Sequence, residues 1–223
     1  ATPHIQEPDL KDMVEDTLGS GNLRVSSVPE NADVFIIAVP TPITDEKKAD
    51  LRAVEAAAES IIPHLRRGNL VILESTVPPG TTQNVLLPIL KRAPSGEGDD
   101  IYLAHAPERV LPGNILSELV QNSRVIGGID LQSAKVAQEI YQSFVKGEIY
   151  LTDATTAETV KVMENAYRDV NIAFANEMSS MAEAIGIDVW QAIQLANKHP
   201  RVNILDPGPG VGGHCIPVDP WFL

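Results

Sequence analysis

The fold of this chain is constrained most by four short, nearly continuous apolar runs that alternate with segments of helical periodicity. The runs are rich in β-branched residues and span 33–39, 69–74, 101–106 and 124–127. Such runs are typical of strands buried on both faces of a parallel sheet. The segments 50–66, 81–90 and 130–144 predict amphipathic helices between them. The alternation predicts an α/β fold with a doubly wound, Rossmann-like, mostly parallel sheet.

A long helix is predicted after the last apolar run. Thr155 and Glu158 have the spacing of a capping box at its start, and helical periodicity continues to Ile185, where Gly186 can end the helix. This stretch of roughly 30 residues is near three times the average helix length. The second half of the chain is therefore predicted to be helical.

Two domains follow from this change of pattern. The α/β domain is predicted at 1–152 and an all-helical domain at 153–223. The helical domain includes a second helix at 189–198 and a Pro/Gly-rich segment at 206–215, which contains the only cysteine of the sequence.

Composition argues against several classes of partner. The chain has 223 residues, with 17 Lys and Arg against 30 Asp and Glu, so its formal net charge is −13. This balance disfavours nucleic acid and anionic membranes as partners. No apolar run approaches the roughly 18 residues of a membrane-spanning helix. A single cysteine excludes an internal disulfide and, without a secretion signal, predicts a cytoplasmic protein.

Three predicted strands are followed by loops rich in turn residues, at 39–42, 74–80 and 106–109. Ligands of open parallel sheets bind outside the carboxyl ends of the strands, so together these loops can line a dinucleotide groove. Each loop alone is better interpreted as a rigid turn, and only the three together favour a site. No G-x-G-x-x-G precedes the first predicted strand, so the phosphate-binding unit of a Rossmann site is expected outside this sequence.

Two polar features of the helical half suggest chemistry. Lys161, Asn165 and Arg168 are spaced i, i+4 and i+7, so they share a helix face that is either solvated or binds an anionic ligand. Cys215 is either an inert buried thiol or a nucleophile held by the surrounding glycines and activated by nearby cations. His214 has no second Cys or His at ligand spacing, so no metal site is predicted.

Eight motifs, in order, resemble those of the UDP-glucose/GDP-mannose dehydrogenase family. They are HIQEPDL at 4–10, IAVPTP at 37–42, LEST at 73–76, PERVLPG at 107–113, RVIGG at 124–128, RDVNIAFANE at 168–177, HPRVNI at 199–204 and GVGGHCIPVD at 210–219. The resemblance covers almost the whole sequence. It implies an NAD-binding Rossmann-like domain at 1–152 and a central domain at 153–223 that forms a homodimer through its long helix.

The resemblance implies a two-step, four-electron oxidation of a sugar C6 alcohol to a carboxylate with two NAD. Cys215 would capture the intermediate aldehyde as a thiohemiacetal and then carry a thioester, which water releases as the uronate. Lys161 matches the lysine that assists proton transfer and stabilises the oxyanion, and Asp219 matches the acid that holds a water with it. Glu108 matches the glutamate that activates water for thioester hydrolysis, with Thr76 nearby.

Further residues match binding positions of the family. The implied substrate positions are Arg109, Val110, Lys161, Asn165, Arg168, His199, Arg201 and Gly210. The implied NAD positions are Val39, Pro40, Thr41, Ser75 and Thr76.

Two departures from the UDP-glucose branch favour a UDP-N-acetylhexosamine substrate. Pro112 and Gly113 stand where that branch carries a second acid, and Val218 stands where its cysteine loop has a lysine. The resemblance thus implies oxidation of UDP-N-acetylmannosamine for cell-surface polysaccharide precursors, with UDP-N-acetylglucosamine or UDP-glucose as alternatives. Competing interpretations are a one-step oxidoreductase that stops at the aldehyde and a helical interaction module without catalysis. The family's C-terminal UDP-binding domain is also expected outside this sequence, so the 223 residues alone are expected to be inactive.

Overall fold

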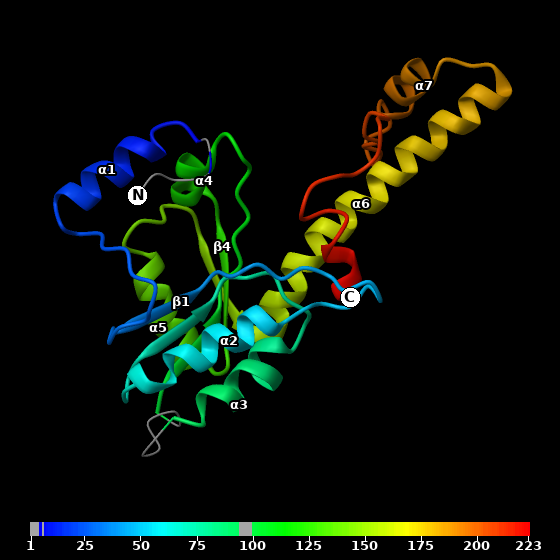
Figure 1. Ribbon diagram of the computed structural model, residues 1–223. Coiled ribbons are helices and arrows are strands. Elements are labelled where there is room, and N and C mark those ends of the chain that lie inside the picture. Colours follow the sequence, from blue (N-terminus) through cyan, green and yellow to red (C-terminus); the bar gives the residue numbers. More distant parts are fainter. Residues whose placement is uncertain (1–4, 6, 94–99) are drawn as a thin grey trace.

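A five-stranded sheet forms the centre of the α/β part of the computed structural model, which describes residues 5, 7–93 and 100–223 (Figure 1). The strands lie in chain order and are β1 (Val34–Ile37), β2 (Leu70–Leu73), β3 (Tyr102–His105), β4 (Arg124–Gly128) and β5 (Ile149–Asp153). Strands β1 to β3 are parallel, β4 is antiparallel to β3, and β5 is parallel to β4. The predicted mostly parallel sheet is confirmed.

Strand β5 is not predicted by the sequence patterns, because it is only partly buried. None of its side chains is fully buried and Tyr150 is exposed, so no continuous apolar run marks it. The pairing of Gly128 with Asp153 brings the end of β5 against β4. The sheet therefore ends directly before the long helix.

Helices cover both faces of the sheet, as the doubly wound prediction requires. One face carries α2 (Arg52–Ile61), the π-helical turn η2 (Thr82–Leu86) and α3 (Leu87–Leu90), and the other carries α5 (Leu131–Tyr141). The alternation of side chains in β2 explains both layers. Val71 and Leu73 face the first group of helices, whereas Leu70 and Ile72 face α5, and all four are buried. Each such burial stabilises the fold by roughly 1.5–3 kcal/mol.

Several helices differ from the sequence prediction in their bounds. The predicted helix at 50–66 is an α-helix only over α2 and then becomes a 3-10 turn, η1 (Ile62–His64), because Pro63 has no N–H to continue the ladder. Helix α5 begins after Asp130, whose carboxylate accepts a hydrogen bond from Ser133 N at 2.7 Å. The patterns do not predict α1 (Leu10–Gly19) or α4 (Ile115–Gln121).

The long helix is α6 (Ala154–Ile185), which has 32 residues and projects away from the sheet (Figure 1). Asp153 caps it, because its carboxylate accepts from Thr156 N at 2.8 Å and from the Thr156 hydroxyl at 2.6 Å. The predicted capping box is wrong, since Glu158 is buried and bonds a different segment. Gly186 ends the helix with φ 76°, as predicted.

Two later elements pack on α6. They are α7 (Val189–Ala196), which follows its N-cap Asp188, and the 3-10 turn η4 (Asp219–Phe222). The glycine-rich segment lies between them and returns the chain toward the sheet (Figure 1). Among the helices described, none has the length and apolar character needed to cross a bilayer.

Candidate active site

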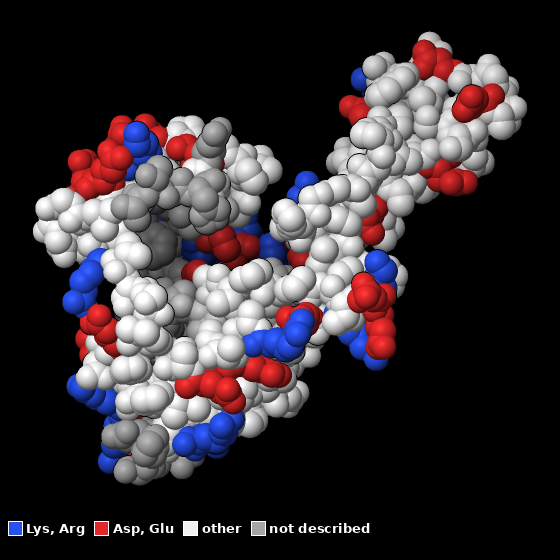
Figure 2. Space-filling model, in the orientation of Figure 1, with Lys and Arg blue, Asp and Glu red and all other residues white. Residues whose placement is uncertain are grey.

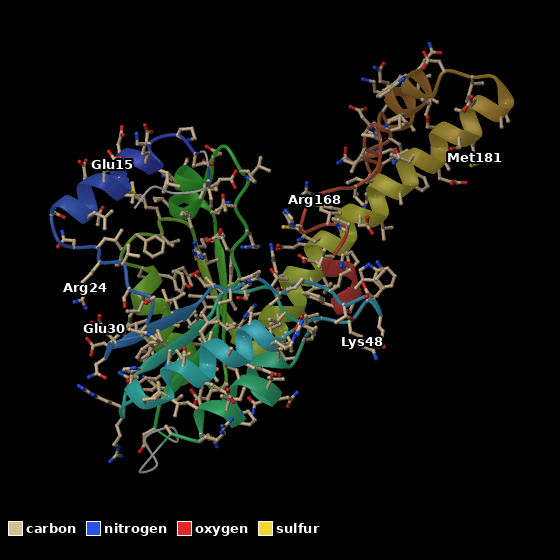
Figure 3. All side chains as sticks on the ribbon, in the orientation of Figure 1. Glu15, Arg24, Glu30, Lys48, Arg168 and Met181 are labelled. Atoms are coloured by element: carbon tan, nitrogen blue, oxygen red, sulfur yellow. The ribbon has the colours of Figure 1, made fainter. Side chains whose placement is uncertain are left out.

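A cavity of about 350 Å³ lies where the loop after β3, the middle of α6 and the glycine-rich segment meet. It is lined by Arg109, Val110, Leu111, Pro112, Lys161, Glu164, Asn165, Arg168, Gly212, His214, Cys215 and Ile216. Figure 3 shows Arg168 on the side of α6 that faces the α/β domain, and Figure 2 shows acidic and basic groups together in the recess there. The structure thus brings together six of the candidate residues: Arg109, Val110, Lys161, Asn165, Arg168 and Cys215.

The polar stripe of α6 reaches this cavity because its spacing places the three side chains on one face. Asn165 is buried, and its Nδ2 donates to Asp219 Oδ2 at 2.6 Å. The stripe is therefore not simply a solvated face. Burial raises the pKa of Asp219, while the Asn165 hydrogen bond and the charge of Lys161 act in the opposite direction.

Cys215 is an exposed free thiol on the cavity wall, so the alternative that it is a buried residue is wrong. The turn that follows it is closed by the N–H groups of Val218 and Asp219, which donate to the Cys215 carbonyl at 3.0 and 2.8 Å. The preceding Gly213 has φ 84°, a left-handed conformation that glycine adopts readily. This turn fixes the thiol and the Asp219 carboxylate in one short segment.

Glu108 lies beside the cavity wall rather than among the lining residues. Arg124 Nη2 donates to its Oε2 at 2.6 Å, and Arg109 N donates to its Oε1 at 2.6 Å. The Arg124 side chain is buried and stacks on the ring of Tyr141, 4.8 Å from the ring centroid. Glu108 is consequently held by two donors at the carboxyl end of β3.

Residues at the carboxyl ends of β1 and β2 form a second cluster. The Thr41 hydroxyl donates to the Thr76 carbonyl at 2.6 Å, and the Ser75 hydroxyl donates to the Val39 carbonyl at 2.6 Å. Together with Pro40, these residues bring all the predicted NAD positions onto two adjoining loops. Their position outside parallel strand ends fits the wall of a dinucleotide groove, although the phosphate-binding turn is not among them.

Three candidate substrate residues lie outside the cavity. His199 and Arg201 follow α7, where Arg201 N donates to His199 Nδ1 at 3.3 Å, and Gly210 lies in the returning segment with φ 98°. Within this chain, the structure does not bring them to Cys215.

Other residues at and near the cavity are not predicted from the sequence. Glu164 lines the cavity and accepts from Arg109 Nη1 at 2.6 Å, so it partly neutralises that arginine. Its spacing of three residues from Lys161 could have revealed it, since i and i+3 positions are neighbours on a helix. His105 ends β3 and is fully buried; burial lowers its pKa to about 3, so it is neutral near Lys161.

The α/β domain with its two strand-end loops, joined to a helical domain that holds a thiol, a lysine and a buried carboxylate, is an arrangement suited to a dinucleotide-dependent dehydrogenase. Two family models match the chain. One describes the UDP-glucose/GDP-mannose dehydrogenase family NAD-binding domain and matches residues 1–145, and the other describes the family's central domain and matches 155–223. The chain belongs to the UDP-glucose/GDP-mannose dehydrogenase family, and the predicted NAD cofactor is confirmed by the first match.

Individual relatives agree with this placement. The chain is 61% identical over 220 residues to a UDP-N-acetyl-D-mannosamine dehydrogenase of Methanocaldococcus jannaschii, covering 97% of this chain and 50% of that protein. It is 54% identical over 227 residues to an NDP-N-acetyl-D-galactosaminuronic acid dehydrogenase of Ralstonia nicotianae, covering 99% and 54%. The solved UDP-D-ManNAc dehydrogenase of Pyrococcus horikoshii superimposes with a TM-score of 0.93 at 49% identity, covering 100% of this chain and 54% of that one. The chain thus spans about half the length of the curated relatives it matches.

Proposed function

We propose that the full-length protein oxidises UDP-N-acetylmannosamine at C6 to the uronate in two NAD-dependent steps. The observation that carries this proposal is the shared cavity of Cys215, Lys161 and Asn165, with Asp219 bonded to Asn165. The names of the relatives support the nucleotide-sugar substrate. Roles for individual residues come from the resemblance and from this geometry.

The cavity offers binding and proton-transfer groups for such a substrate. Lys161 and Arg168 bring positive charge to the lining, which suits the diphosphate of a nucleotide sugar. NAD, when bound, accepts a hydride from the sugar carbon in each oxidation. The loops at 39–41 and 75–76 would form the wall against which it lies, and Lys161 would take the proton released from the C6 hydroxyl.

Cys215 then retains the aldehyde. Its thiolate sulfur adds to the aldehyde carbon, and the new alkoxide is stabilised and protonated by Lys161, giving a thiohemiacetal. After the second oxidation the carbon is a thioester. A water positioned by Asp219 attacks the thioester carbon while Glu108 takes one of its protons. The C–S bond breaks, Cys215 is restored as the thiolate, and the acid formed releases its proton to water to give the carboxylate product.

Counting NADH in the full-length protein tests this scheme. Wild type should form two NADH for each UDP-N-acetylmannosamine consumed, and Cys215→Ala should form no uronate while remaining folded. One NADH per sugar would support the one-step oxidoreductase, and unaltered uronate formation by Cys215→Ala would refute the thiol mechanism. UDP-N-acetylglucosamine and UDP-glucose, assayed in parallel, decide between the substrates.

We also propose that the protein is a cytoplasmic homodimer joined through α6, with a uronate product that feeds surface polysaccharide synthesis. The helix exposes an apolar stripe of Met163, Tyr167, Val170, Phe174 and Met181. Its intervals of four, three, four and seven residues are those of a helix-pairing seam. Light scattering of Phe174→Glu should show a monomer, with Glu183→Gln, an exposed change on the same helix, as control. A dimer in Phe174→Glu would contradict this interface.

A further inference from the structure

Glu158 of α6 is a buried carboxylate with no part in the chemistry described above. Its side chain is fully buried, and it accepts hydrogen bonds from Gly80 N, from Thr82 N at 2.7 Å and from the Thr82 hydroxyl at 2.6 Å. Burial raises the pKa of Glu158, and the bonds from Thr82 and Gly80 act in the opposite direction. A carboxylate is costly to bury, so three donors at one site indicate a specific attachment.

The donors belong to the segment that follows β2. Gly80 closes the loop that starts with Ser75 and Thr76, and Thr82 is the first residue of η2. The first N–H groups of a helix lack partners within it, and the Glu158 carboxylate accepts from the first of them, Thr82 N, and from Gly80 N, which precedes the N-cap Thr81. Gly80 has φ 90°, and a Cβ there would lie 2.8 Å from Asn84 Nδ2, so the loop needs glycine at this point.

The acceptor belongs to the face of α6 that reaches the cavity. Glu158, Lys161 and Asn165 are spaced i, i+3 and i+7, so they lie along one side of the helix. Three residues of helix span about 4.5 Å, and that turn is rigid. Hydrogen bonds join the 39–41 loop to Ser75 and Thr76, at the start of the 75–80 loop. The end of the 75–80 loop is bonded to Glu158, on the helix that carries Lys161.

We propose that Glu158 is a positioning residue that fixes the 75–80 loop, on the NAD side, relative to Lys161 and Asn165. This inference rests on the proposed function for its kinetic consequences. With Glu158 in place, a cofactor against residues 75–76 and a sugar beside Lys161 are held at a constant distance and orientation relative to each other. Without it, the loop and the helix retain their own structures but lose their common anchor.

Glu158→Gln is the decisive variant, because it keeps the shape of the side chain but turns one acceptor oxygen into a donor amide. In the full-length protein we expect kcat to fall and the KM for NAD to rise, each by about tenfold, since a lost charged hydrogen bond has that magnitude. The dissociation constant of UDP-N-acetylmannosamine without NAD should change less than twofold. Glu183→Gln, the same change at an exposed position of α6, should leave all three values unaltered.

Thr82→Val tests the same attachment from its other end. It removes the hydroxyl donor and keeps both the side-chain shape and the Thr82 backbone N–H, so the effect on KM for NAD should be smaller and of the same sign. The double variant Glu158→Gln/Thr82→Val should have a KM for NAD little higher than that of Glu158→Gln alone, because the two groups act as a pair. Fully additive effects would contradict the proposal.

Hydrogen–deuterium exchange gives a readout that does not need turnover. In Glu158→Gln, amides of residues 75–86 should exchange faster while those of β2 and β3 keep their rates. Unchanged exchange at 75–86, or a lowered melting temperature with unaltered kcat and KM in the folded protein, would overturn the positioning role. A wild type inactive on every nucleotide sugar would refute the proposed function, and the exchange experiment would still decide the role of Glu158.

Discussion

Replacing Asn165 with alanine tests how the cavity holds the carboxylate of Asp219. Asn165 Nδ2 lies 2.6 Å from Asp219 Oδ2, and both residues are buried. A hydrogen bond to a charged group contributes about 1.5–3 kcal/mol, and the carboxylate remains desolvated when its donor is lost. We therefore expect Asn165→Ala to lower the free energy of unfolding by about 2 kcal/mol at pH 8.

The size of this loss should depend on pH. Burial raises the pKa of Asp219 above its usual value of 3.8, while the Asn165 bond and Lys161 oppose that rise. A raised folded pKa gives stability that is complete below the unfolded pKa and is lost as the pH rises through the folded pKa. Removing Asn165 raises the folded pKa of Asp219 further, so the loss grows with pH. Asn165→Ala should therefore cost less at pH 3.5, below the usual pKa of an Asp carboxyl, than at pH 8.

Urea unfolding of the full-length protein at these two pH values measures the effect. The matched background is Asp219→Asn, in which residue 219 no longer titrates, so the pH dependence of the Asn165→Ala cost should vanish there. A cost that is equal at pH 3.5 and pH 8 in the wild-type background would refute the reasoning. So would a cost below about 0.5 kcal/mol, the size of an ordinary surface substitution.

Three further outcomes are expected. Gly127→Ala should destabilise the protein by about 1–3 kcal/mol in urea unfolding, because its Cβ would lie 2.3 Å from the Asp153 carbonyl oxygen and 2.7 Å from Ala154 Cα, where α6 meets β4. The control is Gly19→Ala, whose Cβ would meet no atom within 4 Å. Equal losses of stability in the two variants would contradict this account. Tyr141→Phe should cost about 1–3 kcal/mol, because its hydroxyl donates to Glu74 Oε1 at 2.5 Å. Burial raises the pKa of Glu74 above its usual value of 4.5, so the cost should be larger at pH 8, where the carboxylate is ionised, than at pH 4. A cost that is equal at pH 4 and pH 8 would show that this bond does not involve the ionised carboxylate. The 223 residues alone should form no NADH with UDP-N-acetylmannosamine, and turnover comparable to that of the full-length protein would contradict the expectation.

The sheet is predictable because its central strands are buried on both faces, which leaves continuous apolar runs in the sequence. Strand β5 lacks that signature, since Tyr150 is exposed at the edge of the sheet. The start of α6 is misassigned for a related reason. Thr155 and Glu158 satisfy the spacing of a capping box, but the spacing does not record that Asp153 offers a nearer cap and that Glu158 has donors elsewhere in the fold.

The sequence predicts which site residues lie together only where they belong to the same helix or turn. Helical spacing places Lys161, Asn165 and Arg168 on one face, and glycines around Cys215 mark a turn. The meeting of these elements depends on contacts between residues far apart in sequence, such as Asn165 with Asp219 and Arg109 with Glu164. No local pattern encodes those pairs, so residue spacing alone leaves the solvated face and the ligand site as equal alternatives.

The α6 helix explains how one element can serve two domains. Its buried polar residues each attach it to a different segment: Glu158 to the loop after β2, and Asn165 to the turn after Cys215. Lys161 lies between these two attachments on the same face, so its position is set from both sides. A buried polar group is stabilised only while its partners stay in place. The two contacts therefore fix the rotation of α6 about its axis and its position along that axis. The lysine is thereby placed by the fold before any substrate binds.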